Sequence, residues 1–109
     1  MKLPHHDDVQ IDIRKVRDYL LSPVHPVGRF KARVFKALGF DVATVEVFVA
    51  EVRRIASEGD VSEVEDISFG QKYTVPGELR GSISSARVLT VWIQDTGRED
   101  VRLVTVRPE

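Results

Sequence analysis

The pattern of apolar and polar positions changes its period near Gly59, and this change divides the chain into two parts. Before Gly59, apolar residues recur every three or four positions, which is typical of helices. We predict a first helix of about ten residues that begins after Asp12, a second from Gly28 to Gly39, and a third from Asp41 or Thr44 to Gly59. The apolar face of the third helix is the clearest, and consists of Val45, Phe48, Val49, Val52, Ile55 and Ala56.

After Gly59, apolar residues alternate with polar ones as they do in half-buried strands. The predicted strands cover residues 61–68, 71–75, 86–94 and 101–107, and short turns or a Gly/Ser-rich loop separate them. Short connections between consecutive strands favour antiparallel pairing. We therefore predict an α+β fold, in which about three N-terminal helices pack on one face of a four-stranded antiparallel meander sheet.

Length and composition favour one compact domain. The chain has 109 residues, of which 42% are hydrophobic and 30% charged, so neither wholesale disorder nor a membrane span is indicated. Residues 1–10 are polar, include a proline and show no periodicity. We expect these ten residues to form a loose N-terminal arm, and residues 11–109 to form the single α+β domain.

Charge and cysteine content narrow the classes of function. The formal net charge is −1, so any site for a polyanion must be local. The chain has no cysteine, which excludes disulfides and thiolate metal sites and fits a reducing compartment. The start MKLPHHDDVQ lacks an apolar signal segment, so we expect a cytoplasmic protein. Adjacent histidines in a polar terminus are more often solvated than metal-bound, and we predict neither a metal site nor a cofactor.

The segment SPVHPVGRFKARVF, at residues 22–35, carries the most distinctive candidate chemistry. Two prolines stiffen the connector around His25, which fixes the direction of its imidazole. An unperturbed histidine titrates near neutral pH, so His25 is a candidate proton donor or acceptor. The alternative is a histidine that only caps or packs.

Lys31 falls inside the apolar arc that we predict for the second helix, composed of Phe30, Val34, Phe35, Ala37 and Leu38. An ammonium group there is unfavourable unless it meets an anion or extends to solvent. A phosphate would be bound jointly by Lys31, by one of the two arginines Arg29 and Arg33, and by the backbone N–H groups at the helix start. The alternative is a structural lysine whose head reaches a carboxylate such as Asp18 or Glu46.

Several further residues are weaker candidates. Thr105 would present a hydroxyl from the last strand, although threonine is also a common strand former. Tyr73 and Trp92 would stack RNA bases on an uncovered sheet face, or simply pack. Arg87, beside the loop GSISS, would hold an RNA backbone or sit on a solvated edge. Glycine-rich phosphate loops, HExxH and GxSxG are absent from the sequence.

Three segments together resemble a small, poorly characterised bacterial domain family: RKVRDYLLSPVHPVGRFKARVFKALGF, ARVLTVWIQD and RLVTVRP. The specific part is the motif DYLL-x-P-x-HPVG-x-x-KAR. Members of that family are similar to domains at the ends of bacterial toxins and phage head-morphogenesis proteins. Those toxin-end domains resemble the barnase and EndoU-like ribonucleases, which need no metal and have a helical part followed by a four-stranded sheet.

This resemblance implies an active site made of His25, Lys31 and Thr105, and a reaction in which RNA is cleaved through a 2′,3′-cyclic phosphate. It also implies a toxin-like effector, or one member of a toxin and antitoxin pair, with RNA as substrate and an antitoxin or immunity protein as partner. The alternative function is a non-catalytic interaction or immunity-like module that binds an acidic partner, which the near-neutral net charge favours.

Overall fold

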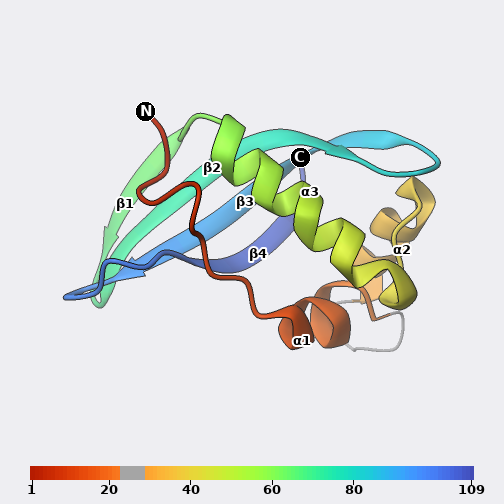
Figure 1. Ribbon diagram of the computed structural model, residues 1–109, viewed down its shortest axis with the longest axis horizontal. Helices are drawn as coiled ribbons and strands as arrows, with labels where there is room; N and C mark the ends of the chain where they lie inside the picture. Colours follow the sequence, from red (N-terminus) through yellow and green to blue (C-terminus); the bar gives the residue numbers. More distant parts are fainter. Residues whose placement is uncertain (23–28) are drawn as a thin grey trace.

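The computed structural model describes residues 1–22 and 29–109, and confirms the predicted α+β class (Figure 1). Helical segments come first, and a sheet with the strand order β1-β2-β3-β4 follows. All three strand pairs are antiparallel, so the predicted meander is confirmed. The elements are α1 (Ile13–Lys15), the π-helix η1 (Val16–Leu20), α2 (Arg29–Leu38), the 3₁₀ helix η2 (Val42–Thr44), α3 (Val45–Glu58), β1 (Glu63–Ile67), β2 (Gly70–Arg80), β3 (Ser85–Asp95) and β4 (Arg102–Pro108).

Local capping interactions explain where the helices begin. The Asp12 side chain accepts hydrogen bonds from the backbone N–H groups of Arg14 and Lys15, at 3.0 and 3.3 Å. Asp41 and Thr44 form a reciprocal capping box that starts η2, which runs directly into α3. The predicted helical segments therefore exist, but the first one widens into a π-helix after Lys15.

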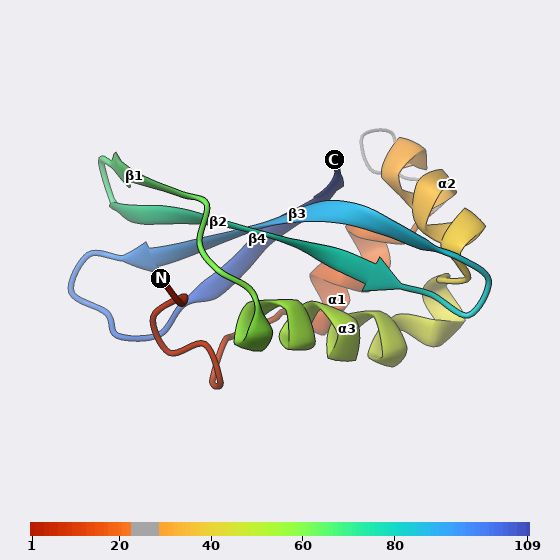
Figure 2. The same ribbon diagram turned by 90° about the horizontal axis from the view of Figure 1, so that it is seen from above.

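Helix α3 covers one face of the sheet (Figure 2). Its buried side chains are those of Phe48, Val49, Val52, Ile55 and Ala56, as the sequence predicts. The close approach to β2 depends on Gly77, where a Cβ atom would lie 2.6 Å from a methyl carbon of Ile55. Any side chain at Gly77 would push the helix away from the sheet.

The two faces of β3 differ in what they contact. Val88, Thr90 and Trp92 are fully buried, and Val88 and Trp92 belong to the main core beneath α3. The indole N–H of Trp92 donates to the Thr90 hydroxyl at 2.8 Å, and that hydroxyl donates to the Val75 carbonyl at 2.7 Å. Because side chains alternate along a strand, Val91 lies on the opposite face, which we call the far face.

Residues 1–10 are part of the packed domain and differ from the loose arm that their polarity suggests. Leu3 and Val9 are only 1% and 3% exposed, and both belong to the main core. The Gln10 N–H donates to the Val101 carbonyl at 2.8 Å. Two almost completely buried apolar side chains, together with backbone hydrogen bonds, hold this segment against the domain.

Helix α2 lies near the end of the edge strand β4 in Figure 2, at the end of the molecule where α3 begins. On its inner side, the ring of Phe35 packs edge-on against Phe48 of α3, with 5.1 Å between centroids. On its outer side, Phe30 and Val34 are exposed, although the helical pattern places them in the apolar arc. Thus α3 occupies one face of the sheet as expected, whereas α2 closes the β4 edge.

Strand β1 forms the opposite edge of the sheet. Four of its five side chains are exposed, and three of these four are acidic: Glu63, Glu65 and Asp66. Lys72 on the neighbouring strand pairs with Glu65 at 3.3 Å. Charged side chains therefore border the free side of this strand.

Candidate functional site

Two of the candidate residues from the sequence meet in the structure. The Lys31 ammonium, in the first turn of α2, donates a hydrogen bond of 2.8 Å to the hydroxyl of Thr105 on β4. These residues are 74 positions apart in the sequence, so the fold alone brings them together. Thr105 pairs with Val91, which places the contact on the far face of the sheet.

The Lys31 ammonium has an electropositive environment. Partial burial lowers its pKa from the ordinary lysine value, and the nearby Arg107 lowers the pKa further. Among the described residues Lys31 has no carboxylate partner, and Asp18 pairs instead with Arg17 at 2.9 Å. Within the described residues, therefore, neither Asp18 nor Glu46 neutralises Lys31, as the structural alternative required.

Further cations continue the far face from this contact. Arg107 is two residues after Thr105 on β4, so both side chains are on the same face, and Arg107 is exposed. Its strand partner is Leu89, two residues after Arg87. Arg87 is also exposed and pairs with Glu109 at 3.3 Å. The far face thus carries Lys31, Arg107 and Arg87 near β4.

The remaining phosphate candidates are not assembled around this contact. Arg33 is exposed on α2, with its guanidinium carbon 5.7 Å from the centre of the Phe30 ring. His25 and the side chain of Arg29 lie outside the described residues. Within the described part of the chain, the site is the pair Lys31 and Thr105 with Arg107 beside it.

Tyr73 and Trp92 do not form the base-stacking surface that we predict for them. Tyr73 is 4% exposed and Trp92 is 0% exposed, so neither ring has a face open to a nucleotide. Both belong to the core cluster beneath α3, and the Tyr73 hydroxyl donates to the Gln71 side chain at 2.8 Å. The alternation of side chains along a strand assigns each residue to one of the two sheet faces, but it does not show which face a helix covers.

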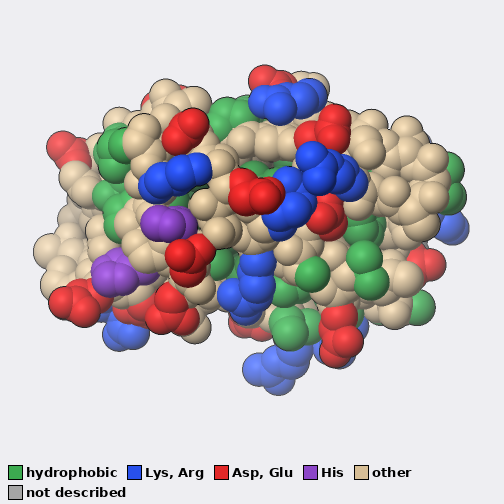
Figure 3. Space-filling view, turned by 45° about the horizontal axis from the view of Figure 1, so that its top comes forward, with side chains coloured by type: hydrophobic (Ala, Val, Ile, Leu, Met, Phe, Trp, Pro, Cys, Tyr) green, Lys and Arg blue, Asp and Glu red, His purple; other side chains and the backbone are tan. Residues whose placement is uncertain are grey.

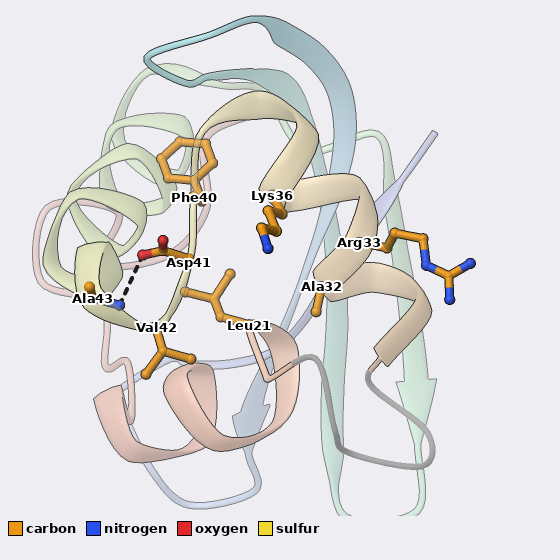
Figure 4. Close-up of a pocket in the computed structure, with 8 residues that line it drawn as sticks. All are labelled: Leu21, Ala32, Arg33, Lys36, Phe40, Asp41, Val42 and Ala43. Atoms are coloured by element: carbon orange, nitrogen blue, oxygen red, sulfur yellow. Dashed lines mark hydrogen bonds between the residues drawn. The ribbon is translucent and has the colours of Figure 1, made fainter.

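A groove beside α2 was not anticipated from the sequence. It has a volume of about 540 Å³ and lies between the end of η1, the side of α2 that carries Ala32 and Lys36, and the start of η2 (Figure 4). Its lining residues are Leu21, Ala32, Arg33, Lys36, Phe40, Asp41, Val42 and Ala43. A sequence signal was present in the short link from Gly39 to Asp41, which forces two helical segments to lie close together.

Within residues 1–22 and 29–109, no three metal-binding side chains come together in a group able to hold an ion. In the same ranges, every helix is too short or too polar to cross a membrane.

The fold and the paired residues define a small α+β domain with a cationic site at one sheet edge. Residues 2–109 match the family described as a domain of unknown function (DUF6883), and the chain belongs to that family. The family match spans nearly the whole chain, as the sequence resemblance to an uncharacterised small domain implies. Neither the curated proteins nor the solved structures include a match to this chain.

Proposed function

We propose that this domain is a ribonuclease that cleaves RNA without a metal ion, at the site formed by Lys31 and Thr105. The observation that carries the proposal is the 2.8 Å hydrogen bond between the Lys31 ammonium and the Thr105 hydroxyl. A partly buried cation without a carboxylate partner among the described residues, next to a second cation at Arg107, favours an anionic ligand. A phosphodiester group supplies that charge.

The chemistry is an internal transesterification of RNA. The 2′-oxygen attacks the adjacent phosphorus and the bond from phosphorus to the 5′-oxygen breaks, which leaves a 2′,3′-cyclic phosphate and a 5′-hydroxyl. Lys31 stabilises the negative charge that gathers on the phosphate oxygens in the transition state. The Thr105 hydroxyl accepts from Lys31 and keeps its own hydrogen to donate to a phosphate oxygen.

Two proton transfers are required, and the chain offers a candidate for each. His25, six positions before Lys31, takes the proton from the 2′-hydroxyl in this proposal, although it lies outside the described residues. The leaving 5′-oxygen needs a proton donor. Because burial and Arg107 lower the pKa of Lys31, its ammonium is a better acid than an ordinary lysine and is our candidate donor.

The resemblance to toxin-end domains supports a biological setting for this activity. We propose that the domain acts as a toxin-like effector or as the toxin of a toxin and antitoxin pair, and that an antitoxin or immunity protein restrains it. Growth arrest on expression, relieved by coexpression of the neighbouring gene product, is the expected cellular result. Harmless overexpression would count against this setting.

The direct test is cleavage of a labelled 20-nucleotide single-stranded RNA in the presence of EDTA. We expect products that end in 2′,3′-cyclic phosphate, a loss of rate of about 100-fold or more for Lys31→Ala, and a similar loss for His25→Ala. Thr105→Val should also slow the reaction. Lys36→Ala, which removes a cation from the same helix outside the site, should retain the rate.

The emission of Trp92, which is fully buried, reports whether each variant is folded. Absence of cleavage by the wild-type protein, or equal rates for wild type and folded Lys31→Ala, would refute the ribonuclease proposal.

A second candidate function is a non-catalytic module that binds an acidic partner. The charge distribution favours it, because α2 carries four cations and no acidic residue in a chain of net charge −1. Such a module would bind its partner without cutting RNA. The cleavage assay therefore separates the two functions.

A further inference from the structure

We infer that the groove between α2 and η2 binds an acidic segment of a partner protein, which inserts an apolar side chain. Lys31 and Thr105 are not among the residues that line the groove, so this inference goes beyond RNA cleavage and holds whether or not the domain is an enzyme. The groove has a shape, a charge and an apolar lining that suit such a segment.

The shape suits a side chain that enters from outside. The groove volume of about 540 Å³ is within the range of ligand-binding pockets. Leu21, Ala32 and Phe40 are each at most 4% exposed and form its apolar base. Val42, which is 40% exposed, stands at its rim. An apolar group placed between Leu21 and Val42 would be largely removed from water.

The charge of the groove comes from one ammonium group. In Figure 4 the Lys36 side chain points into the groove, whereas that of Arg33 points away from it. Neither cation has an ion-pair partner among the described residues. The Asp41 carboxylate accepts hydrogen bonds from the backbone N–H groups of Ala43 and Thr44 at 2.9 and 3.2 Å, and so caps the helix. A ligand with a carboxylate beside an apolar group would complement Lys36.

Several cations elsewhere in the described structure form ion pairs, whereas Arg33 and Lys36 on α2 do not. Arg54 pairs with Glu51 and Glu58, each at 3.0 Å, and Arg102 pairs with Asp95 at 2.8 Å. Figure 3 shows cations and carboxylates intermingled on the side of the molecule where α3 lies. Helix α2 has four cations and no acid, so the rest of the chain has a formal charge of −5. This helix is therefore the surface that an acidic partner would approach.

The apolar surroundings favour a protein over RNA as the occupant. Phe40 is the aromatic residue in the groove, and at 2% exposure it presents no ring face for a base to stack on. Phe30 and Val34, which are 59% and 38% exposed, add apolar area on another side of the same helix. Aromatic and aliphatic side chains on a cationic helix are typical of protein interfaces.

The test is selection from a random 12-residue peptide library displayed on phage, with the wild-type protein immobilised as bait. We expect enriched peptides to carry Asp or Glu within a few positions of a large apolar residue. Synthetic versions should bind with an affinity that Lys36→Glu weakens about fivefold or more, the ratio that corresponds to about 1 kcal/mol. The matched control is Lys15→Glu, the same charge reversal at an exposed lysine on α1 that does not line this groove.

Each alternative occupant has its own signature. The inference is overturned if enriched peptides lack acidic residues, if no peptide is enriched, or if Lys36→Glu and Lys15→Glu weaken binding equally. It is also overturned if a 12-nucleotide RNA binds in a way that depends on Lys36 and the selected peptides fail to displace it. A dimer in sedimentation velocity that Lys36→Glu abolishes would instead identify a second copy of this chain as the occupant.

Discussion

The contact between Lys31 and Thr105 can be tested without any assumption about function, by a double-mutant cycle on stability. Thr105→Val removes the hydroxyl but keeps the shape and the strand preference of the side chain. Lys31→Met removes the charge but keeps most of the apolar stem. The double variant removes both partners, so the cycle isolates the free energy of their interaction.

The structure sets the expected magnitudes. A hydrogen bond to a charged donor contributes roughly 1.5–3 kcal/mol when buried, but Lys31 is only partly buried, so we expect Thr105→Val to lower the free energy of unfolding by about 1 kcal/mol. Lys31→Met loses the same bond but also relieves burial of the ammonium and its repulsion from Arg107. Its stability should therefore match or exceed that of the wild type, and the double variant should resemble it.

The assay is urea denaturation followed by the fluorescence of Trp92, the single tryptophan, which is fully buried in the folded domain. A change of about 1 kcal/mol shifts the urea midpoint by roughly 0.5 M. The predicted coupling energy between the two substitutions is about 1 kcal/mol. A coupling below about 0.3 kcal/mol, which is the usual error of additivity, would mean that the two side chains do not meet in solution.

Three further predictions concern stability. Trp92→Phe should lower the free energy of unfolding by about 2 kcal/mol, because it leaves a smaller ring and removes the donor to Thr90; thermal denaturation by circular dichroism measures this. Glu51→Gln should destabilise at neutral pH, because the bond to Arg54 lowers the pKa of Glu51. That stabilisation is present above the pKa of Glu51 in the unfolded chain, and is lost as the pH falls through its lower pKa in the folded protein. The unfolding free energies of wild type and variant should therefore converge near pH 2. Gly81→Ala should cost about 2 kcal/mol or more, because its Cβ would lie 1.9 Å from a backbone carbonyl oxygen of α2.

The outcomes that would contradict these three predictions are specific. An unchanged melting temperature for Trp92→Phe would mean that its hydrogen bond to Thr90 contributes nothing. A stability difference for Glu51→Gln that persists unchanged to pH 2 would exclude its carboxylate as the cause. A fully stable Gly81→Ala would show that the loop after β2 is not packed against α2.

The fold was largely predictable because its signals are local. The change from helical to alternating periodicity at Gly59 separates helices from strands, and short turns leave consecutive strands few ways to pair other than with their neighbours. The packing of residues 1–10 was not predictable, because Leu3 and Val9 are isolated apolar residues without a period. Their burial depends on surfaces that exist only after the rest of the chain has folded.

The candidate site was predictable only in part. Lys31 was singled out because it interrupts an apolar arc, and the structure does bring it to Thr105. The exact buried side of α2 was not predictable: Ala32 is buried while Phe30 is exposed, because the helix packs at a sheet edge and not under the sheet. Trp92 lies in the core and not on the uncovered face that the sequence suggests, because periodicity separates the two faces of a strand but does not show which face a helix covers.

The acidic edge of the sheet has a consequence for how molecules of this protein meet. Within the described residues, strand β1 has no strand partner on its outer side, and such an edge can template pairing with another chain. Two copies aligned along β1 would bring the carboxylates of Glu63, Glu65 and Asp66 from each molecule into one narrow space. Their mutual repulsion opposes the growth of a continuous intermolecular sheet.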